Sequence, residues 1–185
     1  MTDTQWPRFI VFQQEKEGQP HQYDGSVHAP DAEMALMNAR DVFVRRPACV
    51  SLWVVPADSV FAKTAEQLAD NPLRQERTDG TNESAMTYMI FQKVVHKGTY
   101  VHAGDVSAST PDLALSAAFE SVVKRSALAW WVFPASAITR STPEDIEVLF
   151  QPALNKDFRD QAFYHTVAAM QQIRTRSQDD STDEP

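Results

Sequence analysis

The sequence predicts an α+β protein made of two ββαβ units, each an antiparallel sheet covered by one helix. The first observation is a repeated aromatic and β-branched run that ends in Pro-Ala: residues 52–60 read LWVVPADSV, and residues 130–138 read WWVFPASAI. Such runs are typical of short buried strands that proline terminates. The second observation is a constant spacing, since further identities such as Phe12 with Phe91 lie 79 positions apart. We therefore expect two units related by pseudo-twofold symmetry, followed by a C-terminal arm.

The first unit, residues 1–64, is expected to begin with a hairpin. Residues 8–14 are apolar on both faces, whereas residues 21–29 alternate as in a half-buried strand. Asp31 then follows as the N-cap of a helix, which an apolar stripe predicts to pack on the sheet. The stripe consists of Ala32, Ala35, Leu36, Ala39, Val42 and Phe43.

The second unit, residues 86–142, follows a linker at residues 65–85 and repeats the pattern less regularly. Its hairpin is expected to turn at Lys97-Gly98, and Thr110 with Pro111 is a strong helix start. In each unit the strand after the helix should run antiparallel to the first strand of the hairpin. The beginning of the linker can form a helical turn, whereas its remainder is polar.

Two segments follow the second unit. Residues 143–176 are predicted to form an arm with a short helix near its end, and residues 177–185 are expected to be an acidic, disordered tail. The arm carries aromatic residues without helical or strand periodicity. Such an arm is expected to wrap around its own domain or a partner.

Composition narrows the possible functions. The chain has 185 residues and a net charge of −8, which disfavours a nucleic-acid partner. Its single cysteine, Cys49, excludes an internal disulfide and is expected to be a small core residue. A signal peptide and a long apolar stretch are missing from the sequence, so we expect a cytoplasmic protein without a membrane partner. Units this small bury little surface alone, so they should pack on each other or on a partner.

The sequence shows no recognisable catalytic constellation. The five histidines form no His-x-x-x-His or Glu-x-x-His pair on a predicted helix, and His28 and His96 are expected at the surface. Nucleophile elbows and phosphate-binding glycine loops are also missing. We therefore expect no catalytic, cofactor-binding or metal-binding residues in this chain.

Aromatic and basic residues remain as candidates for a protein interface. Trp53 and Trp130 suit either a core or an interface, where aromatic side chains are enriched. Arg45 and Arg46 end the first predicted helix, where they either complement its dipole or bind a partner. The full candidate set is Arg45, Arg46, Trp53, Trp130, Phe150, Pro152, Lys156, Phe158, Arg159, Phe163 and Tyr164.

Several of these stretches resemble a known family. Residues 6–7 (WP), 25–46 (GSVHAPDAEMALMNARDVFVRR) and 51–57 (SLWVVPA) look like the B subunit of phenylacetyl-CoA epoxidase, the bacterial di-iron oxygenase complex of aerobic phenylacetate breakdown. Residues 150–164 resemble the C-terminal extension of that subunit. The second unit keeps Gly104 but loses the His-Ala-Asp and Asn-Ala-Arg-Asp elements of the first.

The resemblance implies a non-catalytic subunit that bridges catalytic heterodimers and self-associates. It places the di-iron cofactor on a partner subunit, so this chain needs none. The implied partners are the catalytic di-iron oxygenase subunit and its paralogous companion, while contact with the reductase and further self-association stay open. Because the chain is doubled, we expect a covalent pseudo-dimer in place of a homodimer, with a raised effective concentration of the two copies.

Two other classes of function are kept beside this one. Paired α+β units often form a cleft, which would suit a regulatory module that binds an acyl-CoA or an aromatic acid. Thermal stabilisation by such a ligand would identify it. The other class is a small enzyme, which turnover of phenylacetyl-CoA by this chain alone would reveal.

Overall fold

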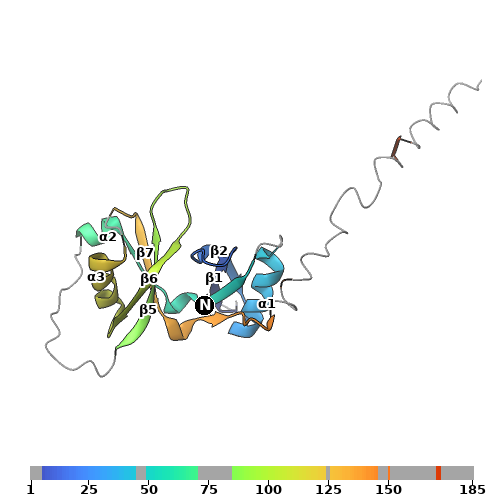
Figure 1. The fold of residues 1–185 in the computed structure, drawn as a ribbon, viewed down its shortest axis with the longest axis horizontal. Coiled ribbons are helices and arrows are strands. Elements are labelled where there is room, and N and C mark those ends of the chain that lie inside the picture. The colour runs from blue at the N-terminus through green and yellow to red at the C-terminus, as the bar shows by residue number, and fades with distance from the viewer. Residues whose placement is uncertain are drawn as a thin grey trace, which may run out of the picture.

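A computed structural model describes residues 6–44, 49–70, 85–123 and 126–145, together with Phe150 and residues 170–171. Its strands form one antiparallel sheet, and its two longer helices lie at opposite ends of the molecule with the strands between them (Figure 1). The α+β class and the antiparallel sheet expected from the sequence are therefore confirmed. The described strands of the two halves join into a single sheet.

The first half of the chain has the predicted order of elements. It consists of β1 (Arg8–Gln14), β2 (Gln22–His28), α1 (Ala32–Phe43) and β3 (Ser51–Pro56). β1 is the central strand of this half, since it pairs antiparallel with both β2 and β3. The predicted hairpin and the direction of the third strand are confirmed.

The second half repeats this order. It consists of β5 (Met86–Lys93), β6 (Val101–Ala108), α3 (Pro111–Ser121) and β7 (Ala129–Pro134). β5 pairs antiparallel with both β6 and β7. The repeated run thus forms β3 and β7, and each of these strands ends at the proline that was expected to terminate it.

The segments that follow β3 and β7 cross to the opposite half. After a 3-10 turn, η1 (Ala57–Ser59), β4 (Phe61–Thr64) pairs with β7 and leads into the short helix α2 (Ala65–Asp70). After a second 3-10 turn, η2 (Ala135–Ala137), β8 (Thr139–Arg140) pairs with β3. The strand order is therefore β4-β7-β5-β6-β2-β1-β3-β8. This exchange was not predicted, although the helical turn at the start of the linker was.

Both long helices begin as the sequence predicts. The Asp31 carboxylate accepts a hydrogen bond from the Met34 amide at 2.8 Å, and the Thr110 hydroxyl accepts one from the Leu113 amide at 3.3 Å. The apolar stripe of α1 is confirmed for Ala35, Leu36 and Ala39, which are buried. It is wrong for Val42, which is 44% exposed. Since Phe43 turns toward the sheet, its chain neighbour Val42 is rotated about 100° away from it, toward the side of the helix.

Three apolar clusters fill the space between the layers. One lies between α1 and its strands and includes Val11, and another lies between α3 and its strands and includes Ile90. The strand faces that point away from the helices form the third, which we call the central core. Its buried members are Ile10, Phe12, Trp53, Val55, Met89, Phe91 and Phe133. Because the central core draws on both halves, residues 8–14 are apolar on both faces.

The crossing segments complete the core of the half that they reach. Phe61 of β4 and Leu68 of α2 pack on the cluster beneath α3. Phe150, which follows β8, is buried in the cluster beneath α1. Each half therefore depends on side chains that the other half of the sequence supplies.

Candidate protein-interaction site

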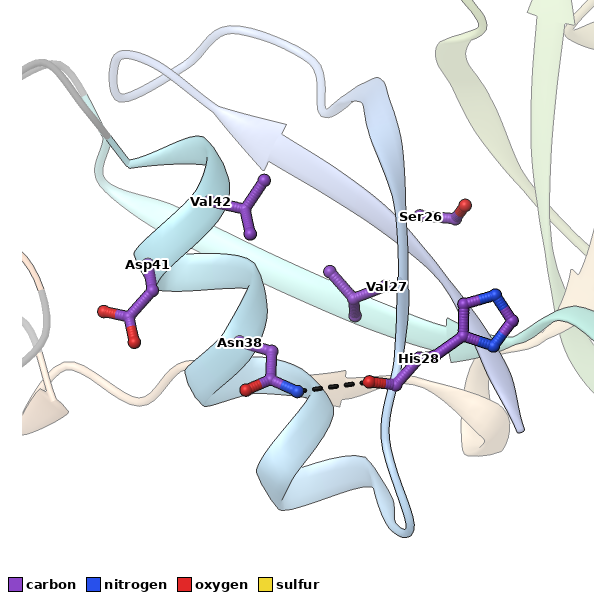
Figure 2. Close-up of a pocket in the computed structure, with 6 residues that line it drawn as sticks. All are labelled: Ser26, Val27, His28, Asn38, Asp41 and Val42. Carbon is purple, nitrogen blue, oxygen red and sulfur yellow. Dashed lines mark hydrogen bonds between the residues drawn. The ribbon is translucent and has the colours of Figure 1, made fainter. Parts of the chain in front are cut away.

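A hollow of about 330 Å³ opens on the surface between α1 and β2. It is lined by Ser26, Val27, His28, Asn38, Asp41 and Val42. Figure 2 shows the strand passing beside the helix, with Val27 on the side of the strand that faces the helix and Ser26 and His28 directed away from it. The hollow therefore lies between α1 and the strand of the first half that neighbours β6.

Hydrogen bonds fix the walls of the hollow. The Asn38 side-chain amide donates to the His28 carbonyl oxygen at 3.2 Å, which ties the helix to the strand (Figure 2). The Nδ1 of His28 lies 2.8 Å from the Trp6 carbonyl oxygen, which can only accept, so the proton is on Nδ1. Asp41 pairs with Arg40 at 2.6 Å and keeps a largely exposed carboxylate. The walls are thus preformed and polar at their rim.

Apolar side chains lie exposed on the same helix. Met34, Met37 and Val42 are 46%, 40% and 44% exposed, respectively. Single exposed apolar residues are ordinary, but a group of them on one helix beside a hollow is a common feature of binding surfaces. The apolar stripe expected from the sequence assigned Val42 to the buried face, so it did not indicate an exposed apolar group on this helix.

Rings from both halves meet where β2 touches β6. The His21 ring stacks on Trp53 with centroids 3.6 Å apart, and the Tyr100 ring stacks on Trp131 at 3.8 Å. His102 lies edge-on to Trp53 at 6.1 Å. His21 is buried, and its Nε2 is 3.0 Å from the Ser51 hydroxyl. No pattern in the sequence indicated that this histidine is buried.

Burial makes His21 hard to protonate. Desolvation, with smaller contributions from His102 and Arg140, lowers the pKa of His21 from 6.5 to about 4. The unfolded chain therefore binds this proton more readily than the folded chain does. The contribution of neutral His21 to stability is complete above pH 6.5 and is lost as the pH falls toward 4.

We expect acidification to destabilise the protein through His21. Protonation should cost on the order of 2 kcal/mol between pH 7 and pH 4, after allowance for partial solvent access to the ring. Urea unfolding at both pH values measures the loss. The control is His21→Tyr, which keeps a stacked ring because Tyr100 occupies the equivalent place in the second half. An equal loss in this variant would assign the pH effect to other groups.

Three of the predicted interface residues are described, and all are buried. Trp53 belongs to the central core, Trp130 is 1% exposed beneath α3, and Phe150 is 5% exposed beneath α1. Trp130 packs edge-on against Phe119 at 5.0 Å. The burial of Trp53 and Trp130 agrees with the alternative that both tryptophans pack in a core. A role at an interface stays a prediction for all three.

The remaining predicted interface residues lie outside the described residues and stay predictions. They are Arg45, Arg46, Pro152, Lys156, Phe158, Arg159, Phe163 and Tyr164.

Cys49 is a core residue, as predicted. It is buried in the cluster beneath α1, and desolvation raises the pKa of its thiol to about 12. A thiol that stays protonated at neutral pH is a poor nucleophile. Ala127, which precedes β7 as Cys49 precedes β3, is buried in the other half.

The described residues contain no group of three or more His, Cys, Asp and Glu side chains that could hold a metal ion. None of the described helices combines the length and apolar character needed to cross a bilayer.

The fold and the hollow thus define an α+β sheet protein with a preformed surface groove. The family model described as "Phenylacetic acid degradation B" matches residues 5–78 and 84–171. The chain belongs to this family, and the resemblance noted from the sequence is confirmed. Phenylacetate degradation is the process to which the family is assigned.

A curated relative supports the same assignment. The chain is 43% identical over 67 residues to the B subunit of 1,2-phenylacetyl-CoA epoxidase from Escherichia coli (strain K12), covering 36% of this chain and 70% of the relative. No solved structure matches the chain significantly.

Proposed function

We propose that this chain is a non-catalytic subunit that bridges the catalytic subunits of a phenylacetyl-CoA epoxidase complex, acting as a covalent pseudo-dimer. The observation that carries the proposal is the match of the family model to two successive segments, each covering one half of the fold. The curated relative is named as a subunit of an epoxidase, which supports a role within an assembly.

The exchanged strands support the pseudo-dimer. The order β4-β7-β5-β6-β2-β1-β3-β8 reads the same when β1–β4 are interchanged with β5–β8 and the order is reversed. The segments after the exchanged strands also correspond. Gln67 and Thr64 cap each other's backbone amides after β4, and the Asp145 carboxylate accepts from the Thr142 amide at 2.7 Å after β8. Two ββαβ units related by a pseudo-twofold axis account for all of these pairs.

The proposed partners are the catalytic di-iron oxygenase subunit and its paralogous companion. In this proposal the di-iron cofactor and the chemistry belong to the partner, and a cytoplasmic location follows from the pathway. A body with two similar but unequal halves can hold two different surfaces at a fixed separation, which is what a bridge requires.

We expect the tagged full chain to retain both catalytic subunits when all three are co-expressed from the same organism. The arm is tested by removing residues 151–164, because a deletion that included Phe150 would open the core beneath α1. The shortened chain should keep its unfolding temperature and bind the catalytic subunits at least tenfold more weakly. Size-exclusion chromatography and titration measure both. A full chain that remains alone would contradict the proposed function, and a shortened chain that binds normally would reject the role of the arm.

The second candidate is a regulatory module that binds an acyl-CoA or an aromatic acid. A cleft between the halves is not favoured, because the rings of the central core fill the space where they face each other. Thermal unfolding with and without phenylacetyl-CoA would test this candidate directly.

A further inference from the structure

The edge of β2 that faces β6 is unpaired along most of its length. The pairing of β2 with β6 consists of the register pair Gln22–Val101, with flanking backbone bonds that reach Tyr23. A bulge follows at once, because Val11 pairs with Gly25 but Phe12 pairs with Tyr23. Bulges bend and twist a strand, so β2 turns away from β6. Among the described residues, the pairing with β6 does not extend beyond Tyr23, so the edge from Asp24 to His28 has no strand partner.

The hollow lies along this open edge. Its strand wall is Ser26, Val27 and His28, which belong to the open part of β2, and its other wall is α1. An open edge beside a helix is the geometry in which an extended peptide adds to a sheet, since the main chain pairs with the edge and alternate side chains enter the groove. Val42 supplies an exposed apolar side chain to this surface, and Met34 and Met37 are exposed on the same helix.

The second half shows that the fold does not require these residues. At the corresponding positions α3 carries Ser116 for Met37, Ala117 for Asn38 and Ser121 for Val42, and β6 carries Ser107 for His28. Both halves nevertheless have the same order of strands and helix. The groove of the first half therefore contains side chains whose presence the stability of the fold does not explain.

Charge indicates what the groove would accept. Among the described residues, Asp41 lines the hollow and Asp24 lies at the start of the open part of β2; both are exposed, and Arg40 pairs with Asp41. Exposed carboxylates thus lie beside the apolar side chains of Val27 and Val42. The complementary segment is apolar, with a basic side chain near one end.

We propose that an extended apolar segment with a basic side chain, contributed by a catalytic subunit of the epoxidase complex, adds to the open edge of β2 and packs against α1. This proposal rests on the proposed function, and it adds which face of the first half binds a catalytic subunit. The corresponding positions of α3 and β6 carry Ser116, Ser121 and Ser107, so the two halves would present different surfaces to the assembly.

A matched pair of substitutions tests the proposal in the co-expressed complex. Val42→Lys places a charge at the groove, and Ser121→Lys places the same charge at the corresponding exposed position of α3. We expect Val42→Lys to weaken binding of the catalytic subunits at least tenfold and Ser121→Lys to change it less than twofold. If the unaltered chain binds and the two variants behave alike, the groove is not the contact. If the unaltered chain does not bind, the proposed function itself fails.

A second variant separates a loss of binding from a loss of folding. Met37→Ser, Asn38→Ala and Val42→Ser together give α1 the residues that α3 already carries, so the unfolding temperature should change by only a few degrees. Loss of binding with retained stability supports the proposal, and retained binding overturns it.

Photo-crosslinking identifies the occupant. A benzophenone amino acid in place of Asp41, an exposed residue of α1 that lines the groove, should crosslink to an extended apolar segment of a catalytic subunit. Crosslinks only to residues 146–185 of the same chain, or only to a second copy, would overturn the assigned occupant.

Discussion

Phe12→Ala should lower the free energy of unfolding by about 4 kcal/mol. Phe12 is fully buried in the central core, where its ring centroid lies 4.2 Å from Phe91, 5.4 Å from Phe133 and 6.3 Å from Trp131. All three of these rings belong to the second half, so truncation opens a cavity between the halves. Total stabilities are commonly about 5–15 kcal/mol, which makes this a large part of the whole.

Chemical denaturation followed by both circular dichroism and tryptophan fluorescence measures this effect. The two signals should report one coincident transition, because the central core and the exchanged strands make each half depend on the other. Val95→Ala is the control, since Val95 is 58% exposed and its truncation should change stability by less than about 0.5 kcal/mol. Two separate transitions, or a loss below about 1 kcal/mol for Phe12→Ala, would contradict the shared core.

Local patterns predicted the elements correctly, because they are carried by neighbouring residues. The alternation in β2, the N-caps at Asp31 and Thr110, and the prolines that end β3 and β7 each act within a few positions. The repeat itself came from identities at fixed spacing. Resemblance to a family then added the assignment to phenylacetate degradation, which composition and periodicity could not provide.

The exchange of β4 and β8 could not be predicted in this way. β8 has two residues and β4 has four, too few for alternation to identify a strand. Their partners are also distant in sequence, and either half could have kept its own segment. Thr64 and Thr142 were a detectable signal, since both follow the repeated run at the same distance and precede a Gln or an Asp by three positions.

The groove was missed for a related reason. The helix stripe placed Val42 in the core, and only aromatic and basic side chains and one proline were expected at an interface. A comparison of the two halves would have found it, because Met37 and Val42 of α1 correspond in sequence to Ser116 and Ser121 of α3. The burial of His21 has no such signal, since its neighbours Pro20 and Gln22 are those of an ordinary turn.

Gly104→Ala should cost about 3 kcal/mol, nearly as much as opening the central core. Gly104 follows the bulge in β6 and has a φ of +154°, a conformation that residues with a side chain rarely adopt. A Cβ at this position would lie 2.4 Å from Cγ1 of Val122, just after α3. Backbone strain and steric overlap therefore add, and the helix must move away from the sheet.

Two further variants separate these causes. Gly18 also has a positive φ, +77°, but a Cβ there would meet no atom within 4 Å, so Gly18→Ala should cost only about 1 kcal/mol. Adding Val122→Ala to Gly104→Ala removes the overlapping methyl group and should recover part of the loss in a double-mutant cycle. If the double variant is less stable by the full sum of the two single losses, steric overlap is not the cause. Gly25 is the equivalent glycine of the first half, and a Cβ there would lie 2.5 Å from the ring of Phe43 at the end of α1. Both halves therefore use a glycine to let the end of the helix pack closely on the strand.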